Sequence, residues 1–238
     1  MLNFKFLLNL YNIQEIKILK LSILVLTNNS KELFNQAFQS IINTKLDFGY
    51  EILINEYSNI VHNEPLHLLK DKHLKNIKFF YNNDKDLSNV YLSLLKNAKG
   101  EYIYFLEDDD LLLPPFLKGI QSLINENIDL GYFNYFDYKG LSLEFKDSKS
   151  LNFKEFCNTY NHYKNFQLSR FITKKSIITK FPQGNNVLND WFLFCSLTPK
   201  TFKVYKYLIY KQGTPRVSMK PYNTGFYECL TPILKEIF

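Results

Sequence analysis

The sequence predicts an α/β fold in which helices cover both faces of a mostly parallel central sheet. Short aliphatic runs alternate in the first half of the chain with segments whose apolar residues recur at helical spacing. The aliphatic runs end in polar loops, as strands buried on both faces do. Hydrophobic residues make up 46% of the 238 residues, so the chain can bury a sizeable core.

The first half contains the more regular elements. In order, we expect a strand over 18–27, a helix that follows Ser30 and includes apolar residues from Leu33 to Ile42, strands over 50–54 and 77–81, a helix from Leu87 to Ala98, a strand over 101–106 and a helix beginning at Pro114 and Pro115. Ser30 is a candidate N-cap, and Gly100 is a candidate helix stop. Strands that alternate with helices imply parallel pairing through crossover connections.

The second half is less regular. We expect strands over 130–138, 168–173 and 202–210 and helices over 152–161, 189–197 and 226–237. No change in composition marks a domain boundary. We therefore expect a single domain over 1–238, divided into an N-terminal half at about 18–117 and a C-terminal half at about 118–238.

Charge and cysteine content narrow the class of protein. The formal net charge is +6, but the lysines are scattered and no recognition motif accompanies them, so nucleic-acid binding is not expected. A peripheral contact with an anionic membrane surface fits this charge better. Cys157, Cys195 and Cys229 show no CxxC spacing, which favours a reducing compartment, and the apolar runs are too short to span a bilayer. We expect a cytoplasmic protein, with the inner membrane as a peripheral contact.

Four consecutive carboxylates, residues 107–110, follow directly on the strand over 101–106. Crowding these charges between two apolar segments is unfavourable unless a cation neutralises them, and oxygen ligands suit a divalent metal ion. Ligands in open α/β sheets bind at the carboxyl ends of the strands. The residues alone favour a metal and phosphate site and leave a plain acidic loop open.

Four segments in order resemble family 2 glycosyltransferases. Residues 21–29 resemble the opening strand of that family, residues 50–58 its second strand, residues 97–103 the Ala-x-Gly-Glu-Tyr-Ile entry to its metal-binding strand, and residues 107–110 its acidic DXD-type motif. The resemblance covers about Leu21 to Leu117. It implies a GT-A fold, which is Rossmann-like with helices flanking the sheet, a donor half for the nucleotide sugar and a less regular acceptor half.

The resemblance implies roles for residues of the acidic motif. Asp109 would bind Mn²⁺ or Mg²⁺ directly, between the two phosphates of a nucleotide diphosphate. Glu107 and Asp110 would be further ligands or would hold metal-bound water. Asp108 would face the ribose or the sugar.

Two strand ends would complete the donor site. Glu56 would accept hydrogen bonds from the base or ribose, and Thr27 would position the nucleotide. Each also has a plain interpretation, as a loop carboxylate and a strand-end threonine. Asn28 and Tyr91 stand where the family commonly has tyrosine and arginine, so base stacking and a phosphate partner must come from elsewhere.

In the acceptor half, residues 187–194 resemble the segment in which an acidic pair opens a helix and supplies the catalytic base. Asp190 matches the second member of that pair and would be the base; on the residues alone, an N-cap is the commoner role. Arg216 lies where relatives carry a basic loop near the diphosphate, although a solvated surface arginine is the commoner state.

The sequence therefore predicts a metal-dependent inverting glycosyltransferase, with Mn²⁺ or Mg²⁺ as cofactor. Its expected partners are a nucleotide-diphosphate sugar, with a UDP-sugar favoured, and a glycan or lipid-linked acceptor of a bacterial surface glycan. A nucleotidyltransferase is disfavoured because residues 27–30 lack a glycine-rich loop. A catalytically impaired nucleotide-sugar-binding module stays open.

Overall fold

The computed structural model describes residues 18–27, 31–43, 46–56, 76–82, 84, 87–108, 110–137, 152–159, 168–181 and 189–211. The strands are β1 (Leu19–Thr27), β2 (Gly49–Glu56), β3 (Ile77–Tyr81), β4 (Tyr102–Glu107), β5 (Asp110–Leu111), β6 (Leu130–Asp137), β7 (Phe171–Lys174) and β8 (Phe202–Lys211). The α-helices are α2 (Lys31–Ile42), α4 (Leu87–Asn97), α5 (Pro114–Asn125), α6 (Phe153–Thr159) and α7 (Asn189–Ser196), and the short 3-10 helices are η2 (Leu168–Arg170) and η3 (Lys175–Ile177).

All described strands belong to one sheet with the order β3-β2-β1-β4-β7-β6-β8-β5. Strands β3, β2, β1 and β4 are parallel, which confirms the prediction for the first half. The direction changes at β7, which runs antiparallel to both β4 and β6. Strand β6 then pairs in parallel with β8, and β5 pairs in antiparallel orientation with β8. The sheet is therefore mixed, with its parallel half built from the N-terminal residues.

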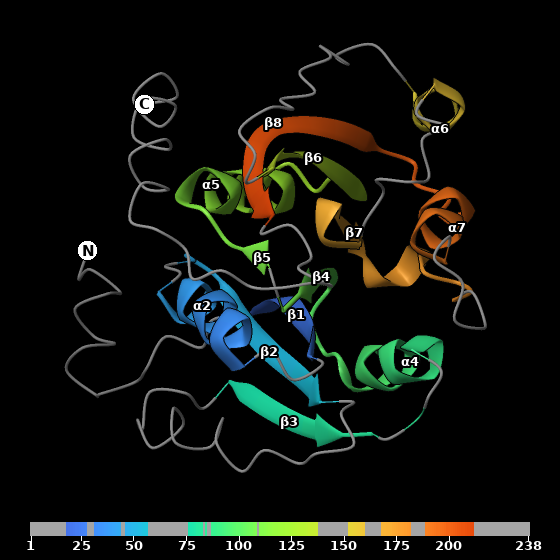
Figure 1. The fold of residues 1–238 in the computed structure, drawn as a ribbon. Coiled ribbons are helices and arrows are strands. Elements are labelled where there is room, and N and C mark those ends of the chain that lie inside the picture. The colour runs from blue at the N-terminus through green and yellow to red at the C-terminus, as the bar shows by residue number, and fades with distance from the viewer. Residues whose placement is uncertain are drawn as a thin grey trace, which may run out of the picture.

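Helices cover both faces of this sheet (Figure 1). Alternate residues of each strand point to opposite faces. One face of the sheet packs with α2 and α5 through residues such as Phe38 and Phe116, which are at most 1% exposed. The other face packs with α4, α6 and α7 through residues such as Leu94, Phe156 and Phe194. This two-sided packing confirms the predicted α/β fold with helices on both faces of the sheet.

Two elements differ from the sequence prediction, and two expected features lie outside the described residues. Residues 168–170 form η2 rather than the start of a strand, and β7 begins at Phe171. The two-residue strand β5 was not predicted because it is too short to show any periodicity. The expected N-cap Ser30 and the expected helix over 226–237 lie outside the described residues. Within those residues, no helix has the length and apolar content needed to cross a bilayer.

Gly100 is required where α4 turns into β4. A Cβ atom at this position would lie 2.5 Å from the backbone nitrogen of Ser22, which is closer than real contacts allow. The close approach lets the Gly100 N–H donate to the Ser22 hydroxyl at 2.8 Å, and that hydroxyl donates to Glu51 at 2.8 Å. This network joins β1, β2 and the start of β4 at the amino ends of the strands.

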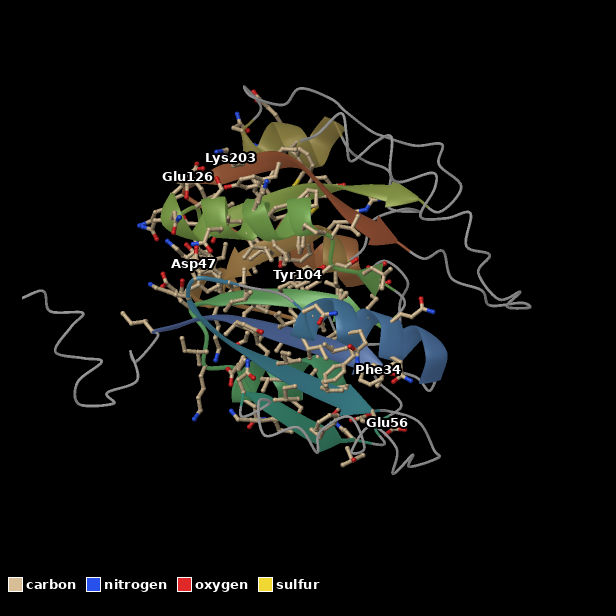
Figure 2. All side chains as sticks on the ribbon, turned by 90° about the vertical axis from the view of Figure 1, so that its left-hand side faces the viewer. Phe34, Asp47, Glu56, Tyr104, Glu126 and Lys203 are labelled. Atoms are coloured by element: carbon tan, nitrogen blue, oxygen red, sulfur yellow. The ribbon has the colours of Figure 1, made fainter. Side chains whose placement is uncertain are left out.

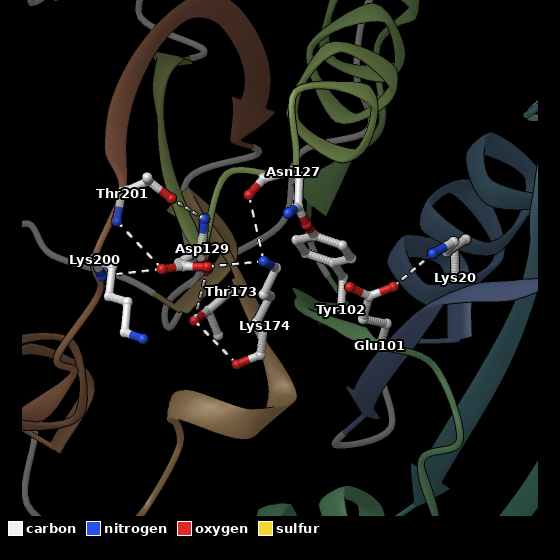
Figure 3. Close-up of polar contacts among 9 residues, drawn as sticks. All are labelled: Lys20, Glu101, Tyr102, Asn127, Asp129, Thr173, Lys174, Lys200 and Thr201. Atoms are coloured by element: carbon white, nitrogen blue, oxygen red, sulfur yellow. Dashed lines mark hydrogen bonds and ion pairs between the residues drawn. The ribbon is translucent and has the colours of Figure 1, made fainter.

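Asp129 joins three segments of the C-terminal half (Figure 3). Its carboxylate accepts hydrogen bonds from the Lys174 ammonium at 2.8 Å and from the backbone N–H groups of Lys200 at 2.9 Å and Thr201 at 3.2 Å. Burial raises the pKa of the Asp129 carboxyl, but these donors lower it more, so its pKa lies below the ordinary value of 3.8. The carboxylate therefore holds the beginnings of β6 and β8 against the end of β7.

Replacing Asp129 with alanine should lower the free energy of unfolding at pH 7 by about 1–3 kcal/mol, because three donors lose a shared acceptor. The folded-state pKa is depressed, so this contribution is complete above pH 3.8 and disappears as the pH falls through the folded pKa. Urea denaturation of both proteins across this pH range tests it. Glu126→Ala is the matched control, because its pair with Lys203 is exposed and should contribute about 0–1 kcal/mol (Figure 2). Equal losses in the two variants would contradict the prediction.

Candidate active site

The carboxyl ends of β1, β2 and β4 meet at one edge of the sheet because the three strands are parallel. Thr27 of β1 pairs with Glu56 of β2, and Leu26 pairs with Glu107 of β4. Figure 2 shows Glu56 at this edge and Asp47 at the opposite edge. The structure therefore brings together three of the strand ends that sequence analysis selected.

A hydrogen bond joins the end of β1 to the acidic motif. The Thr27 hydroxyl donates to the Asp108 carboxylate at 2.9 Å, and Thr27 is only 6% exposed. Residues 27 and 108 are distant in sequence, so this contact depends on the pairing of β1 with β4. Thr27 thus has a structural task, which is to hold the turn that follows β4.

The described residues of the acidic motif differ in how deeply they are buried. Glu107 and Asp108 are partly buried, whereas Asp110 is fully buried in β5. The neighbouring Leu112 N–H donates to the Ser40 hydroxyl of α2 at 3.0 Å, and β5 pairs with β8. Strand β5 is therefore fixed between the two halves of the protein. Asp109 lies outside the described residues.

Negative charge concentrates beside Tyr104, which is fully buried in β4. Burial raises the pKa of its hydroxyl well above 10.0, and the charges of Asp110 and Glu107 raise it further. The hydroxyl has no hydrogen-bond partner among the described residues. The same charges favour a cation in their neighbourhood, and carboxylate oxygens suit Mn²⁺ or Mg²⁺. The carboxylates of Glu107, Asp108 and Asp110 are the ligand type that Mn²⁺ and Mg²⁺ prefer, but the described residues contain no group of three His, Cys, Asp or Glu side chains that could hold a metal ion.

Asn55 was not selected from the sequence. It precedes Glu56 at the end of β2, is 0% exposed, and neither its amide nitrogen nor its oxygen has a hydrogen-bond partner among the described residues. Leaving a buried amide without partners costs about 1–3 kcal/mol. The only sequence signal is that a polar residue ends an otherwise aliphatic run.

Arg170 is a second residue that sequence analysis missed. It ends η2, is 5% exposed, and its Nη1 atom donates to the Tyr132 hydroxyl at 2.8 Å. Tyr104 pairs with Ile172, so η2 lies beyond this pair, toward the carboxyl end of β4. The buried guanidinium of Arg170 therefore lies toward the carboxyl end of β4, where the acidic motif begins. Sequence analysis assigned residues 168–173 to a strand and therefore did not select Arg170 as a candidate site residue.

The predicted base lies at the start of a helix, as expected. Asp190 is the second residue of α7, and the structure describes its backbone. Helix α7 is anchored by Phe194, whose ring packs at 5.2 Å from that of Phe171 and at 6.0 Å from that of Tyr132. These contacts dock α7 beside β7 and β6. Arg216 lies outside the described residues.

The family is shown by a comparison of sequences. The sequence profile described as "Glycosyl transferase family 2" matches residues 22–183, which begin within β1, extend past β7 and include the acidic motif. The chain belongs to glycosyltransferase family 2. The matched range confirms the resemblance that the four N-terminal segments indicated.

Part of this glycosyltransferase is similar in sequence to a bacterial N-acetylglucosaminyltransferase. The poly(ribitol-phosphate) beta-N-acetylglucosaminyltransferase TarP of Staphylococcus aureus is 32% identical over 111 residues, which are 45% of this chain and 34% of TarP. The matched part is thus about a third of that relative's length.

Two solved structures share the fold of this glycosyltransferase. Residues 1–349 of S. aureus TarS, in complex with UDP-GlcNAc, match with a TM-score of 0.65 and 18% identity, over 92% of this chain and 66% of that chain. The mannosyltransferase PcManGT of Pyrobaculum calidifontis, in complex with GDP-Man and Mn²⁺, matches with a TM-score of 0.56 and 12% identity, over 83% of this chain and 58% of that chain. These similarities confirm the GT-A-like fold.

Proposed function

We propose that this family 2 glycosyltransferase is a metal-dependent, inverting enzyme that transfers a sugar from a nucleotide-diphosphate sugar to a hydroxyl of a glycan or glycolipid. One observation carries the proposal: Thr27, Glu56 and the Glu107–Asp108 pair meet at the carboxyl edge of the parallel strands. Open α/β sheets bind their ligands at this edge.

The donor that we propose is UDP-GlcNAc. TarS carries this compound in its complex, and the name of TarP specifies N-acetylglucosamine transfer. Glu56 would accept hydrogen bonds from the base or ribose. Asn55 lies beside it, and its amide offers both a donor and an acceptor. Asp108, held by Thr27, would face the ribose or the sugar.

The proposed cofactor is Mn²⁺ or Mg²⁺, held by Asp109 with help from Glu107 and Asp110. Such an ion would stabilise the negative charge of the departing nucleotide diphosphate. The complex of PcManGT with GDP-Man and Mn²⁺ supports this assignment within the same fold. Arg216 is a further proposed contact of the diphosphate.

We assign proton removal to Asp190 at the start of α7. Its carboxylate would take the proton of the acceptor hydroxyl, whose oxygen then attacks the anomeric carbon from the face opposite the leaving group. A single displacement of this kind inverts the anomeric configuration.

An anionic glycan polymer is the acceptor class that we propose. The name of TarP specifies poly(ribitol-phosphate), and the net charge of this chain is +6. A positive protein attracts a polyanionic acceptor and raises its local concentration. The proposed location is the cytoplasm, with peripheral contact at the membrane that carries the acceptor.

A turnover assay with UDP-GlcNAc tests the function. We expect release of UDP that requires Mn²⁺ or Mg²⁺ and rises when a poly(ribitol-phosphate) acceptor is added. NMR of the product should show the anomeric configuration opposite to that of the donor. Tight nucleotide binding without any turnover would instead identify a binding module, and retention of configuration would contradict the single displacement.

Replacing Glu56 with alanine should weaken UDP binding by about 1–3 kcal/mol, because a charged hydrogen-bond acceptor is lost. Calorimetry in the presence of Mn²⁺ measures this loss. Glu101→Ala is the matched control, because Glu101 is an exposed carboxylate that pairs with Lys20 just before β4 begins. Unchanged affinity in Glu56→Ala would show that Glu56 does not contact the nucleotide and only ends β2.

A further inference from the structure

Helices α6 and α7 bring two cysteines together that are distant in sequence. The rings of Phe156 and Phe194 pack at 5.9 Å, and those of Phe153 and Phe194 pack at 5.2 Å. The residues that follow Phe156 and Phe194 are Cys157 and Cys195. Both thiols are free, and each changes the acidity of the other. Sequence analysis did not identify this pair, because the spacing of the two cysteines resembles no known cysteine motif.

The two thiols differ in exposure and in acidity. Cys195 is exposed and Cys157 is half-buried. Interaction with Cys157 lowers the pKa of the Cys195 thiol, although burial opposes this. Interaction with Cys195 and burial both raise the pKa of Cys157. Cys195 is therefore the more exposed thiol and ionises at the lower pH. Cys157 is half-buried and keeps its proton to a higher pH. The thiolate is the reactive form of cysteine.

We infer that Cys157 and Cys195 form a dithiol site that low-molecular-weight disulfides oxidise to an intramolecular disulfide between α6 and α7. The inference is independent of the proposed sugar transfer, because it concerns only these two helices.

The oxidation proceeds by two exchanges. The Cys195 thiolate attacks one sulfur of oxidised glutathione, so a mixed disulfide forms, the glutathione S–S bond breaks and one glutathione thiolate leaves. Cys157 then loses its proton to solvent, and its thiolate attacks the Cys195 sulfur. The Cys157–Cys195 bond forms as the mixed disulfide breaks and releases a second glutathione. Two protein thiols are oxidised, and one oxidised glutathione is reduced to two molecules of glutathione.

A disulfide between Cys157 and Cys195 would constrain α7, the helix that also carries Asp190. Helix α7 begins at Asn189 and Asp190 and ends one residue after Cys195. Helix α6 docks on the same face of the sheet, where Phe156 packs against Phe202 at 5.0 Å. A disulfide would therefore tie α7 to α6 by a covalent bond in addition to aromatic packing.

The experiment uses the full chain carrying Cys229→Ser, so that only the two paired thiols react. The folded protein is incubated with oxidised glutathione, the remaining thiols are blocked with a maleimide, and peptides are analysed by mass spectrometry. We expect a linked peptide that contains both cysteines and a loss of about 2 Da from the intact mass.

Two variants on the same background test the order of the steps. Cys157→Ser should accumulate the mixed disulfide at Cys195, because the second thiol is missing. Cys195→Ser should react with oxidised glutathione at least about tenfold more slowly, because the remaining thiol is half-buried and less acidic. Circular dichroism establishes that each variant is folded.

Three outcomes would overturn the inference. The first is the absence of a linked peptide from the folded protein. The second is a linked peptide that forms no faster in the folded protein than in urea, since the fold would then contribute nothing. The third is faster reaction of Cys195→Ser than of Cys157→Ser, which would reverse the assigned roles.

Discussion

Replacing Asp190 with asparagine should slow sugar transfer by about 10²–10⁴-fold and leave donor binding unchanged, because a general base contributes on this scale. Asparagine keeps the size and shape of the side chain and differs from ionised aspartate in carrying no charge. The packing of Phe194 against β6 and β7 should then persist and hold α7 in place. The change therefore removes only the proton acceptor.

A binding curve for UDP-GlcNAc and a transfer assay on the same preparation separate the two effects. Thermal unfolding provides the control for the fold, and Asn189→Ala controls for the neighbouring position at the helix start. Transfer at nearly the wild-type rate by Asp190→Asn would leave Asp190 as an ordinary residue in the first turn of α7 and the proposed mechanism without its base.

Asp109→Ala should reduce metal-dependent binding of UDP by about 10²-fold or more. Outer residues around a metal typically change its affinity by about 10–100-fold, and a direct ligand contributes at least as much. The expected loss should be confined to measurements with Mn²⁺, since the proposed nucleotide contacts of Glu56 would remain. Calorimetry with and without Mn²⁺ separates a loss of metal-dependent binding from a loss of direct nucleotide contacts.

The matched control for this loss is Asp47→Ala. Asp47 is an exposed carboxylate at the opposite edge of the sheet from Glu56, so its removal changes the net charge equally without touching the site (Figure 2). Equal affinities of Asp109→Ala and Asp47→Ala for UDP with Mn²⁺ would remove Asp109 from the metal site.

The N-terminal half could be predicted closely because its signals are local. The aliphatic runs that became β1, β2 and β4 each show strand character within a few residues, and parallel pairing follows from the helices between them. The meeting of Thr27, Glu56 and Glu107 at one edge follows in turn, because parallel strands align their carboxyl ends. Their chemical roles stay predictions.

The remaining features depend on contacts between distant residues. Strand β5 gains its pairing from β8, and the three donors to Asp129 come from β7 and the entry to β8. The burial of Asn55 and Arg170 depends on helices and strands that pack over them. Periodicity within a short window carries no information about such contacts.

The reversal of strand direction at β7 has a consequence for how relatives of this enzyme can diverge. Because β7 runs opposite to β4, the chain enters β7 at the edge where β4 ends in the acidic motif. Insertions or deletions ahead of β7 can therefore alter what borders that edge without disturbing the register of β1, β2 and β4. Selection can change what binds beside the acidic motif while the strands that carry Thr27, Glu56 and Glu107 keep their arrangement.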